Sequence, residues 1–290
     1  MSTIFDRLIA ATPEYRDPLQ EIDWNAADPD LPWLPEKMIS IAHLPIWRTL
    51  DEAQRLRVSK VEFARLCAAG LWLEGLLVHR VTHKGFVAAD TKETHIVLQE
   101  VREETGHGLM FLKMIDKAGM GGKHLLGPTR LLTSVAKMLD PEGPGFWAMV
   151  YLGESITDNF AIMALRVASE EGEEICPVAR QVMKWHHNDE ARHIAAAKAM
   201  LRDKLDTMSG VERAFFKAVV GVLVKRFLRA TLFPSLPSLE ALGLADPEGV
   251  WRAAHADADR HVLARACADP ALTTLFKRLG QERAAPVDAA

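Results

Sequence analysis

Three histidines and two acidic residues lie within the ten positions of the segment KWHHNDEARH (184–193). Because an α-helix turns about 100° per residue, His186, Glu190 and His193 would share one stripe of a helix, whereas His187 would point elsewhere. Ionisable groups on a stripe that faces a protein core are costly unless they are paired or bind a metal. The pattern therefore indicates either a solvated His/Glu face or a metal site.

A second segment, QEVREETGHGLMF (99–111), favours the metal site. It carries Glu104 and His107 at the same i, i+3 spacing as Glu190 and His193. This spacing lets one helix supply two ligands to a metal inside a helical bundle. Two such motifs on separate helices are much rarer than one.

Neighbouring residues leave two of these assignments open. Glu100 shares a helix face with Glu104, and Glu103 adjoins it, so either could take its place. His187 adjoins His186 in the same way. The spacing favours Glu104 and His186.

A bundle that holds two metals between two Glu-x-x-His helices takes one further carboxylate from each of two other helices. Glu74 is the single acid of the apolar run 66–78, and Glu154 lies in a comparable run; each precedes one of the motifs. Thr157 and Asp158 follow Glu154 on the same face and are predicted to hold a ligand side chain. The predicted metal ligands are Glu74, Glu104, His107, Glu154, His186, Glu190 and His193.

The donor types indicate which metals would bind. Four carboxylates and three imidazoles without a thiolate suit two iron ions, or manganese, whereas structural zinc takes a closed set of four ligands, often with cysteine. An HExxH zinc motif is excluded because no glutamate directly follows His186 or His187. Cys67, Cys176 and Cys267 are widely separated and predict neither a disulfide framework nor a thiolate site.

The elements that must position these residues are helices. From residue 51 onward, apolar residues recur every three or four positions, and Gly- and Pro-rich breaks separate the segments. The predicted helices are 51–82, 91–117, 128–139, 145–171, 175–208, 211–232 and 247–267. The predicted architecture is all-α and forms a single domain, with a metal-binding four-helix bundle at 51–208 and accessory C-terminal helices at 209–280.

Both ends of the chain differ from this pattern. The first fifty residues contain six prolines and three tryptophans, which predicts an irregular arm (1–50) packed onto the domain by its aromatic side chains. The last ten residues, 281–290, are predicted to form a loose tail.

Composition excludes several classes of function. The chain has 35 basic and 39 acidic residues and no Lys/Arg-dense block, so nucleic acid is not an expected partner. The N-terminus lacks the apolar segment of a secretory signal, and the longest apolar runs are far shorter than the roughly 20 residues that span a bilayer. A cytoplasmic protein without a membrane partner is expected.

The order Glu, Glu-x-x-His, Glu, His-x-x-x-Glu-x-x-His resembles the ferritin-like diiron oxygenases of the p-aminobenzoate N-oxygenase (AurF-like) family. That family adds a histidine four residues before the last glutamate, the position of His186 here, which ordinary ferritins, desaturases and ribonucleotide reductase small subunits lack in this spacing. The resemblance runs from about Trp33 to about Leu205 and includes the segment LPIWRTLDEAQRLRVSKVEF (44–63). It implies a ferritin-like bundle that forms a homodimer, and a diiron centre held by the seven residues above, with a bridging carboxylate from each Glu-x-x-His motif.

The resemblance implies that the protein uses O2 and an electron donor to oxidise a small-molecule arylamine to a hydroxylamine and then to nitroso or nitro products. One alternative is hydroxylation or desaturation at a C–H bond of an aliphatic or acyl substrate. Another is a non-catalytic, ferritin-like iron-binding protein. His186 favours the first, and the Pro/Trp-rich arm fits a ferritin shell poorly.

The substrate-binding residues are not assigned by the sequence. Positions one turn from the predicted ligands could line an apolar pocket, but side chains at this spacing more often form core, and core is expected for most of them. These positions are Leu77, Val78, Val81, Met110, Phe111, Met114, Ala161 and Val182.

Overall fold

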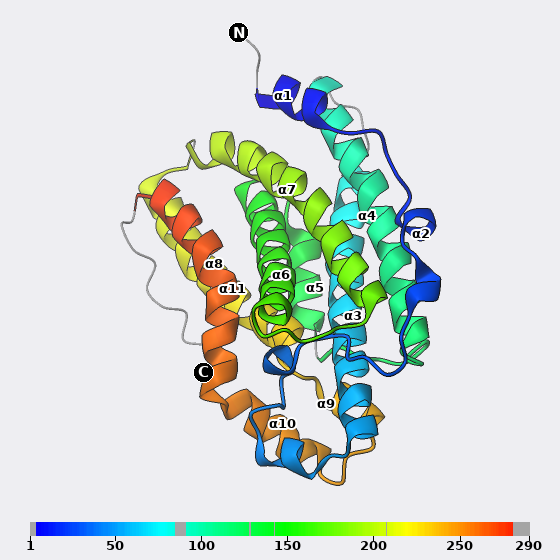
Figure 1. Cartoon of the computed structure of the whole chain (residues 1–290). Coiled ribbons are helices and arrows are strands. Elements are labelled where there is room, and N and C mark those ends of the chain that lie inside the picture. Colours follow the sequence, from blue (N-terminus) through cyan, green and yellow to red (C-terminus); the bar gives the residue numbers. More distant parts are fainter. Residues whose placement is uncertain (1–3, 85–90, 128, 142, 207, 281–290) are drawn as a thin grey trace.

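The computed structural model describes residues 4–84, 91–127, 129–141, 143–206 and 208–280, and every regular element in these ranges is a helix (Figure 1). Four long helices form the bundle: α3 (Glu52–Lys84), α4 (Thr91–Lys117), α6 (Pro144–Glu170) and α7 (Pro177–Asp206). Helix α3 packs along α4, and α6 packs along α7, as two antiparallel pairs. The predicted all-α, ferritin-like class is confirmed.

Shorter helices surround this bundle. Helix α11 packs against α6, and α8 contacts α3, α5 and α6. The bounds of these helices are α5 (Arg130–Met138), α8 (Gly210–Leu232), α9 (Leu236–Ala241), α10 (Pro247–Ala256) and α11 (Ala258–Arg278).

Local signals explain where the long helices begin and end. Helix α6 starts with Pro144, whose fixed φ suits the first helical turn. It ends just before Gly172, which has a φ of +66° that only glycine adopts without cost. Helix α8 starts with a reciprocal capping box between Ser209 and Glu212. The first six predicted helices begin and end within two residues of the observed helices.

The single helix predicted over 247–267 is wrong, because the chain forms two helices there. Asp257 is in an extended conformation, and its carboxylate accepts the Arg260 N–H at 3.0 Å, which caps a new helix. This helix, α11, continues through Pro270 to Arg278. The break predicted at 233–238 is also shorter, since the Ser235 hydroxyl caps α9 within it.

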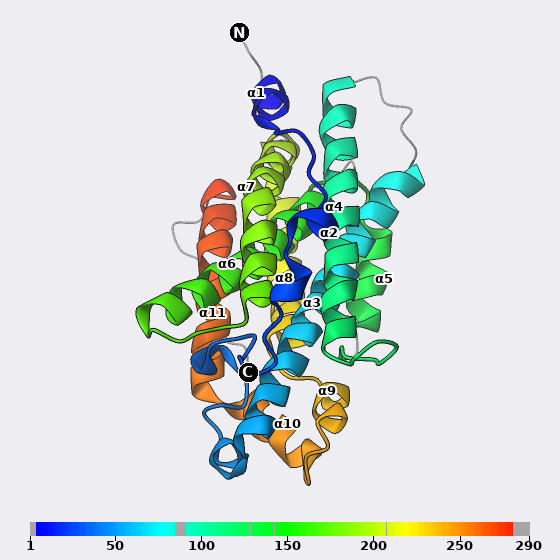
Figure 2. The same cartoon turned by 45° about the vertical axis from the view of Figure 1, so that its right-hand side comes forward.

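The N-terminal arm is less irregular than predicted. It contains α1 (Ile4–Ala11), α2 (Pro18–Glu21) and three 3-10 helices, η1 (Trp24–Ala26), η2 (Glu36–Met38) and η3 (Pro45–Thr49). Helices α1 and α2 contact α4, and α1 and η1 contact α7. The arm therefore runs along both α4 and α7, as the positions of α1 and α2 in Figure 2 show.

The arm is also tied to the bundle by buried groups. Trp33 and Trp47 are buried, as expected for an arm held by its aromatics. The Ser59 hydroxyl of α3 accepts the backbone N–H groups of Trp33 and Leu34, both at 2.9 Å. Among the described helices, none combines the length and apolar character needed to cross a membrane. The predicted tail, 281–290, lies outside the described residues.

Candidate metal centre

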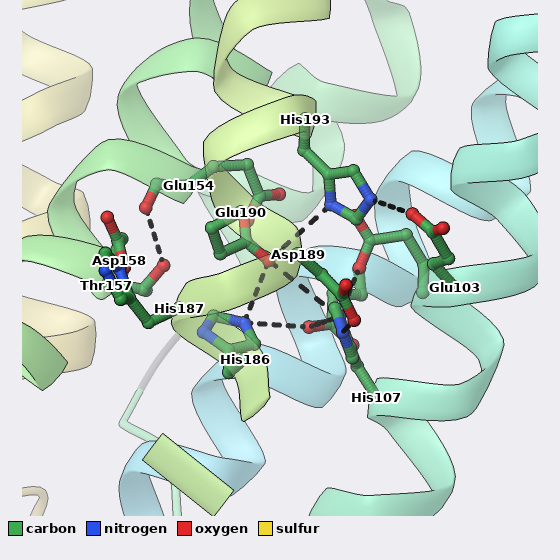
Figure 3. A network of polar contacts seen from close by, with 12 residues as sticks. Glu103, His107, Glu154, Thr157, Asp158, His186, His187, Asp189, Glu190 and His193 are labelled. Atoms are coloured by element: carbon green, nitrogen blue, oxygen red, sulfur yellow. Dashed lines mark hydrogen bonds and ion pairs between the residues drawn. The ribbon is translucent and has the colours of Figure 1, made fainter. Parts of the chain in front are cut away.

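The bundle brings all seven predicted ligand side chains into one buried cluster between α3, α4, α6 and α7. Figure 3 labels His107, Glu154, His186, Glu190 and His193 among them. None of the seven side chains belongs to a residue more than 7% exposed. Each side chain comes from a helix that the sequence predicted. The i, i+3 and i, i+4 spacings place the ligand candidates of one helix on the same face, which here is turned to the core. The cluster members are Glu74, Glu104, His107, Glu154, His186, Glu190 and His193.

Six of these residues form two overlapping groups that could each hold a metal ion. One group is Glu74, His107, His186 and Glu190, and the other is Glu104, His107, Glu190 and His193. Within each group the candidate ligand atoms lie within 4.8 Å of one another. Both groups share His107 and Glu190, so the cluster offers two adjacent positions.

Glu190 occupies the centre of the cluster. Its Oε1 lies 3.1 Å from His186 Nε2, 3.6 Å from His193 Nδ1 and 3.8 Å from His107 Nδ1. Glu104 spans the two Glu-x-x-His motifs, with one oxygen 3.3 Å from His107 Nδ1 and the other 3.0 Å from His193 Nδ1. A carboxylate that faces imidazoles from two helices is suited to bridge two ions.

Glu74 and Glu154 approach from the two remaining helices. Glu74 Oε1 is 3.4 Å from His186 Nε2 and 3.7 Å from His107 Nδ1. Glu154 belongs to neither compact group, but its side chain extends toward Glu190 (Figure 3). The cluster therefore receives one extra carboxylate from α3 and one from α6.

Protein groups alone do not satisfy this cluster. Buried polar atoms normally have hydrogen-bond partners, and exceptions need an explanation such as an ion. Within the described part of the chain, the following cluster atoms have none: Glu74 Oε1 and Oε2, Glu104 Oε1, Glu154 Oε1, Glu190 Oε1 and Oε2, and His193 Nδ1. An oxygen-rich donor set with imidazole nitrogen, turned inward and unsatisfied, fits iron or manganese.

The pKa values of the carboxylates in the metal-free cluster do not all rise, although crowding of like charges alone would raise them. Burial raises the pKa of Glu154 well above its ordinary value, and the nearby Glu190 and Glu104 charges add to this effect. Burial also acts on Glu104 and Glu190, but the imidazoles of His193 and His186 outweigh it, so the pKa of each is lowered. In the metal-free cluster, protonation is therefore favoured at Glu154 and disfavoured at Glu104 and Glu190.

The pKa values of two imidazoles shift in the opposite direction, upward. Burial disfavours their charged form, yet hydrogen bonds to Asp189 and Glu104 raise the pKa of His107 well above its usual value. The carboxylates of Glu104 and Glu190 raise the pKa of His193 in the same way. These pKa shifts favour protonated imidazoles beside ionised carboxylates in the metal-free cluster, and a bound metal would displace those protons.

Outside the cluster, Glu103, Asp189 and Arg192 form a ring of charged side chains. Each of its two carboxylates orients the imidazole of the opposite helix. His193 of α7 contacts Glu103 of α4 through Nε2 at 2.8 Å, and His107 of α4 contacts Asp189 of α7 through Nε2 at 3.1 Å. Arg192 donates to both carboxylates, at 3.0 Å to Glu103 and 2.9 Å to Asp189. Such outer carboxylates leave Nδ1 of each ring facing the cluster and raise its basicity as a ligand.

Sequence reasoning missed this ring, although a signal for it exists. In both motifs an acidic residue directly precedes the cluster glutamate: Glu103 before Glu104 and Asp189 before Glu190. The sequence offers Glu103 only as an alternative to Glu104, and helix geometry puts Asp189 about 100° from Glu190, off the stripe of His186, Glu190 and His193. The structure places each beside the histidine of the opposite helix.

We expect Asp189→Asn to weaken metal binding about 10- to 100-fold, because a neutral amide supports the His107 imidazole less well than a carboxylate does. Competition against a chelator of known affinity measures this change. Asn188, the exposed preceding residue, provides the matched control, and Asn188→Ala should bind metal normally. Equal affinities for the two variants would contradict the orienting role of Asp189.

The alternative residues next to the cluster lie outside both groups. His187 Nδ1 is 2.6 Å from Asp158 Oδ1, so His187 is turned away from His186 and Glu190. Glu103 faces the outer side of His193. Glu100 is buried, and its Oε1 has no hydrogen-bond partner among the described residues.

Glu100 provides a pH-dependent test of the metal-free fold. Burial raises the pKa of its carboxyl to about 8, helped by the Glu104 and Glu103 charges against the opposing effect of His193. Unfolding restores the ordinary value, so Glu100 lowers the free energy of unfolding increasingly as pH rises from about 4.5 to 8, by about 1.4 kcal/mol per unit. We expect Glu100→Gln to be more stable than the parent protein by a few kcal/mol at pH 8 and nearly equal at pH 5. Denaturant unfolding of the metal-free proteins measures this, and a pH-independent difference would contradict it.

The two residues predicted to hold ligand side chains do not contact the cluster in that way. The Thr157 hydroxyl donates to the backbone carbonyls of Gly153 and Glu154, both at 3.1 Å, because a threonine in a helix readily bonds to the preceding turn. Asp158 contacts His187, which is not in either group. The prediction that Thr157 and Asp158 hold the side chain of a metal ligand is therefore wrong for the contacts of this structure.

An apolar cavity of about 70 Å³ lies beside the cluster and reaches His186. Phe111, Ala161 and Val182, which the sequence placed one turn from ligands, line it, whereas Leu77, Met110 and Met114 are packed core. The Phe111 ring lies 5.3 Å from the His186 ring between centroids. Gly70 makes room for it, since a Cβ there would come within 2.5 Å of the Phe111 ring.

Paired helices around a buried, unsatisfied cluster of carboxylates and imidazoles define a ferritin-like, metal-capable bundle. The chain belongs to the p-aminobenzoate N-oxygenase AurF family, whose model matches residues 4–280. The resemblance inferred from the sequence is thereby confirmed, and the family is one of diiron oxygenases.

Individual relatives are more distant. The uncharacterized protein Rv0885 of Mycobacterium tuberculosis is 23% identical over 225 residues, and the uncharacterized protein Mb0909 of Mycobacterium bovis is identical to the same extent. These matches cover 75% of the chain but only 65% of each relative. The relatives' names state no substrate or reaction.

Proposed function

We propose that this protein is a non-haem diiron oxygenase that uses O2 to oxidise the nitrogen of an arylamine. The observation that carries this proposal is the position of His186 in the cluster of a chain of the AurF family, in contact range of Glu74 and Glu190. The first step consumes one O2, two electrons and two protons for each amine, and gives a hydroxylamine and water. An electron donor must supply the two electrons.

The seven cluster residues are the proposed ligands of the two ions. Two ferrous ions held by these residues would provide the place where O2 is reduced and would pass on the electrons received from the donor. Four ionised carboxylates, Glu74, Glu104, Glu154 and Glu190, would balance the four positive charges of two ferrous ions. His107 and His193 would bind through Nδ1 while their Nε2 atoms keep the contacts to Asp189 and Glu103.

The protein's own contribution is geometry and exclusion of water. Every proposed ligand is buried, so charges interact in a low-dielectric environment and the bulk solvent is kept from the reacting nitrogen. The apolar cavity beside His186 marks the side of the cluster from which a substrate would approach. A cytoplasmic homodimer with a small-molecule substrate is part of the proposal.

Anaerobic reconstitution with ferrous iron tests this function. Two irons per chain, followed by O2-dependent conversion of an added arylamine to N-oxidised products identified by mass spectrometry, are expected. Oxygen consumption that yields only C–H oxidation of an aliphatic or acyl substrate would overturn N-oxygenation. Failure to bind iron would overturn the ligand assignment, and a large shell in gel filtration would favour iron storage.

Metal binding should also stabilise the fold. An ion that binds only the native state adds about 2.7 kcal/mol to the free energy of unfolding when its free concentration is about 100 times its dissociation constant. For a chain of this size, we expect Tm to rise by about 5–10 °C on loading. Calorimetry of chelator-treated and anaerobically iron-loaded samples measures the change, and identical melting curves would contradict a buried dinuclear site.

A further inference from the structure

The apolar cavity beside His186 is too small for an aromatic ring but large enough for a small gas molecule. Its volume is about 70 Å³. An apolar protein cavity that binds benzene has a volume of about 150 Å³, whereas one water molecule needs roughly 10–15 Å³. A diatomic molecule is little larger than water, so it fits here without displacing any side chain.

The lining of this cavity disfavours water. Among the described residues, its polar side chains are His186, Thr157, Thr231 and Cys67. The hydroxyls of Thr157 and Thr231 already donate to backbone carbonyls of their own helices, at 3.1 and 2.8 Å. An ordered water needs about two to four polar partners, and apolar cavities that lack them stay dry and take up apolar atoms such as xenon.

The cavity also joins the cluster to the outer part of the bundle. His186 forms part of its wall, and His186 Nε2 lies 3.1 Å from Glu190 and 3.4 Å from Glu74. Leu66 of α3 and Thr157 of α6 are partly exposed, whereas the other lining residues are buried. A molecule that enters past Leu66 therefore comes next to a proposed metal ligand.

A second apolar cavity provides a comparison. It has a volume of about 60 Å³ and lies between α3, α5, α6 and α8, with Trp72, Ala148 and Phe227 in its wall. Among the described residues that line it, none belongs to the metal cluster. The two cavities are therefore alike in size and lining, and only the one beside His186 touches a proposed ligand.

We propose that O2 reaches the metal cluster through the cavity beside His186, which holds the gas next to the reacting centre. This inference rests on the proposed oxygenase function and specifies where one of its two substrates binds. O2 is small, uncharged and apolar, so transfer from water into an apolar cavity is favourable for it and unfavourable for water. The cavity thus admits O2 while the buried ligands stay dry.

Xenon tests the cavity without any reaction. Crystals of the anaerobic, iron-loaded protein under xenon pressure should show xenon beside His186 and in the comparison cavity, because both cavities are apolar. Crystals of the metal-free protein give the same test independently of iron binding. Absence of xenon beside His186 overturns the inference, whatever the protein does with O2.

Two matched substitutions test whether O2 uses this cavity. Ala69 lines the cavity beside His186, and Ala148 lines the comparison cavity; both are buried, and neither is a proposed ligand. Ala69→Leu and Ala148→Leu fill the two cavities with the same side chain. When diferrous protein is mixed with O2, we expect Ala69→Leu to lower the second-order rate constant about tenfold and Ala148→Leu to leave it nearly unchanged. In steady state, Ala69→Leu should raise the KM for O2 and keep the kcat of the parent protein.

A second pair of variants keeps the test available if Ala69→Leu does not fold. Leu66→Trp covers the partly exposed side of the cavity with a larger ring. Its control is Leu131→Trp, because Leu131 is 50% exposed and lines neither cavity. We expect the KM for O2 to rise in Leu66→Trp and to stay unchanged in Leu131→Trp, with two irons per chain in both.

The outcomes separate the O2 site from the function. Normal O2 kinetics in Ala69→Leu and Leu66→Trp, with both irons bound, overturn the inference and leave the oxygenase standing. A loss in Ala148→Leu without one in Ala69→Leu also overturns it. Slower O2 consumption in the two variants, combined with a parent protein that forms no N-oxidised product, supports the O2 site and overturns N-oxygenation. Protein that binds no iron, or that binds iron without consuming O2, overturns both.

Discussion

Replacing His186 with alanine is expected to leave about one iron per chain and to lower N-oxidation about a hundredfold or more, whereas replacing His187 should leave two irons and near-normal turnover. The structural difference is clear for these neighbours. His186 Nε2 lies 3.1 Å from Glu190 and 3.4 Å from Glu74, within one of the two metal-capable groups only. His187 instead contacts Asp158.

The stoichiometry distinguishes this prediction from general damage. The group of Glu104, His107, Glu190 and His193 does not include His186, so it should keep its ion in His186→Ala. Iron analysis after desalting, paired with turnover of the same sample, measures both effects. A variant that keeps two irons and full turnover would show that His186 is not a ligand.

The four long helices and the cluster could be predicted because both depend on local periodicity. Apolar residues every three or four positions define the buried face of a helix, and the same spacing puts Glu104 beside His107 and Glu190 beside His193. The cap at Asp257 could not be anticipated in the same way. An aspartate is tolerated within a helix or at its start, and only the direction of the following chain decides which.

The acids of the outer ring have a signal in the sequence, but their partners, like the lining of the cavity, could not be predicted because they depend on contacts between distant segments. Glu103 meets His193 from 90 residues away, and Asp189 meets His107 from 82 residues away. A helical wheel shows only that these acids lie off the ligand stripe. The cavity joins side chains from the bundle helices and α8, and the Phe111 ring in its wall fits there only because Gly70 has no side chain.

Replacing Glu190 with glutamine should have the largest effect of any single substitution, since Glu190 alone among the carboxylates belongs to both metal-capable groups. Its Oε1 faces His107, His186 and His193, so loss of its charge affects both positions. We expect fewer than one iron per chain under conditions that load the parent protein, and turnover lower by about a thousandfold or more, because a metal ion contributes several kcal/mol to the stabilisation of a transition state.

The same variant separates metal binding from folding. Glutamine keeps the shape of the side chain, so the metal-free variant should remain helical by circular dichroism. The rise in Tm that iron produces in the parent protein should be absent, because the variant has no shared carboxylate with which to hold either ion. A variant that loses turnover but keeps both irons and the iron-dependent rise in Tm would show that Glu190 acts in the reaction without binding the metals, and the ligand set would then have to be completed by Glu100, a buried carboxyl nearby that is not among the seven proposed ligands.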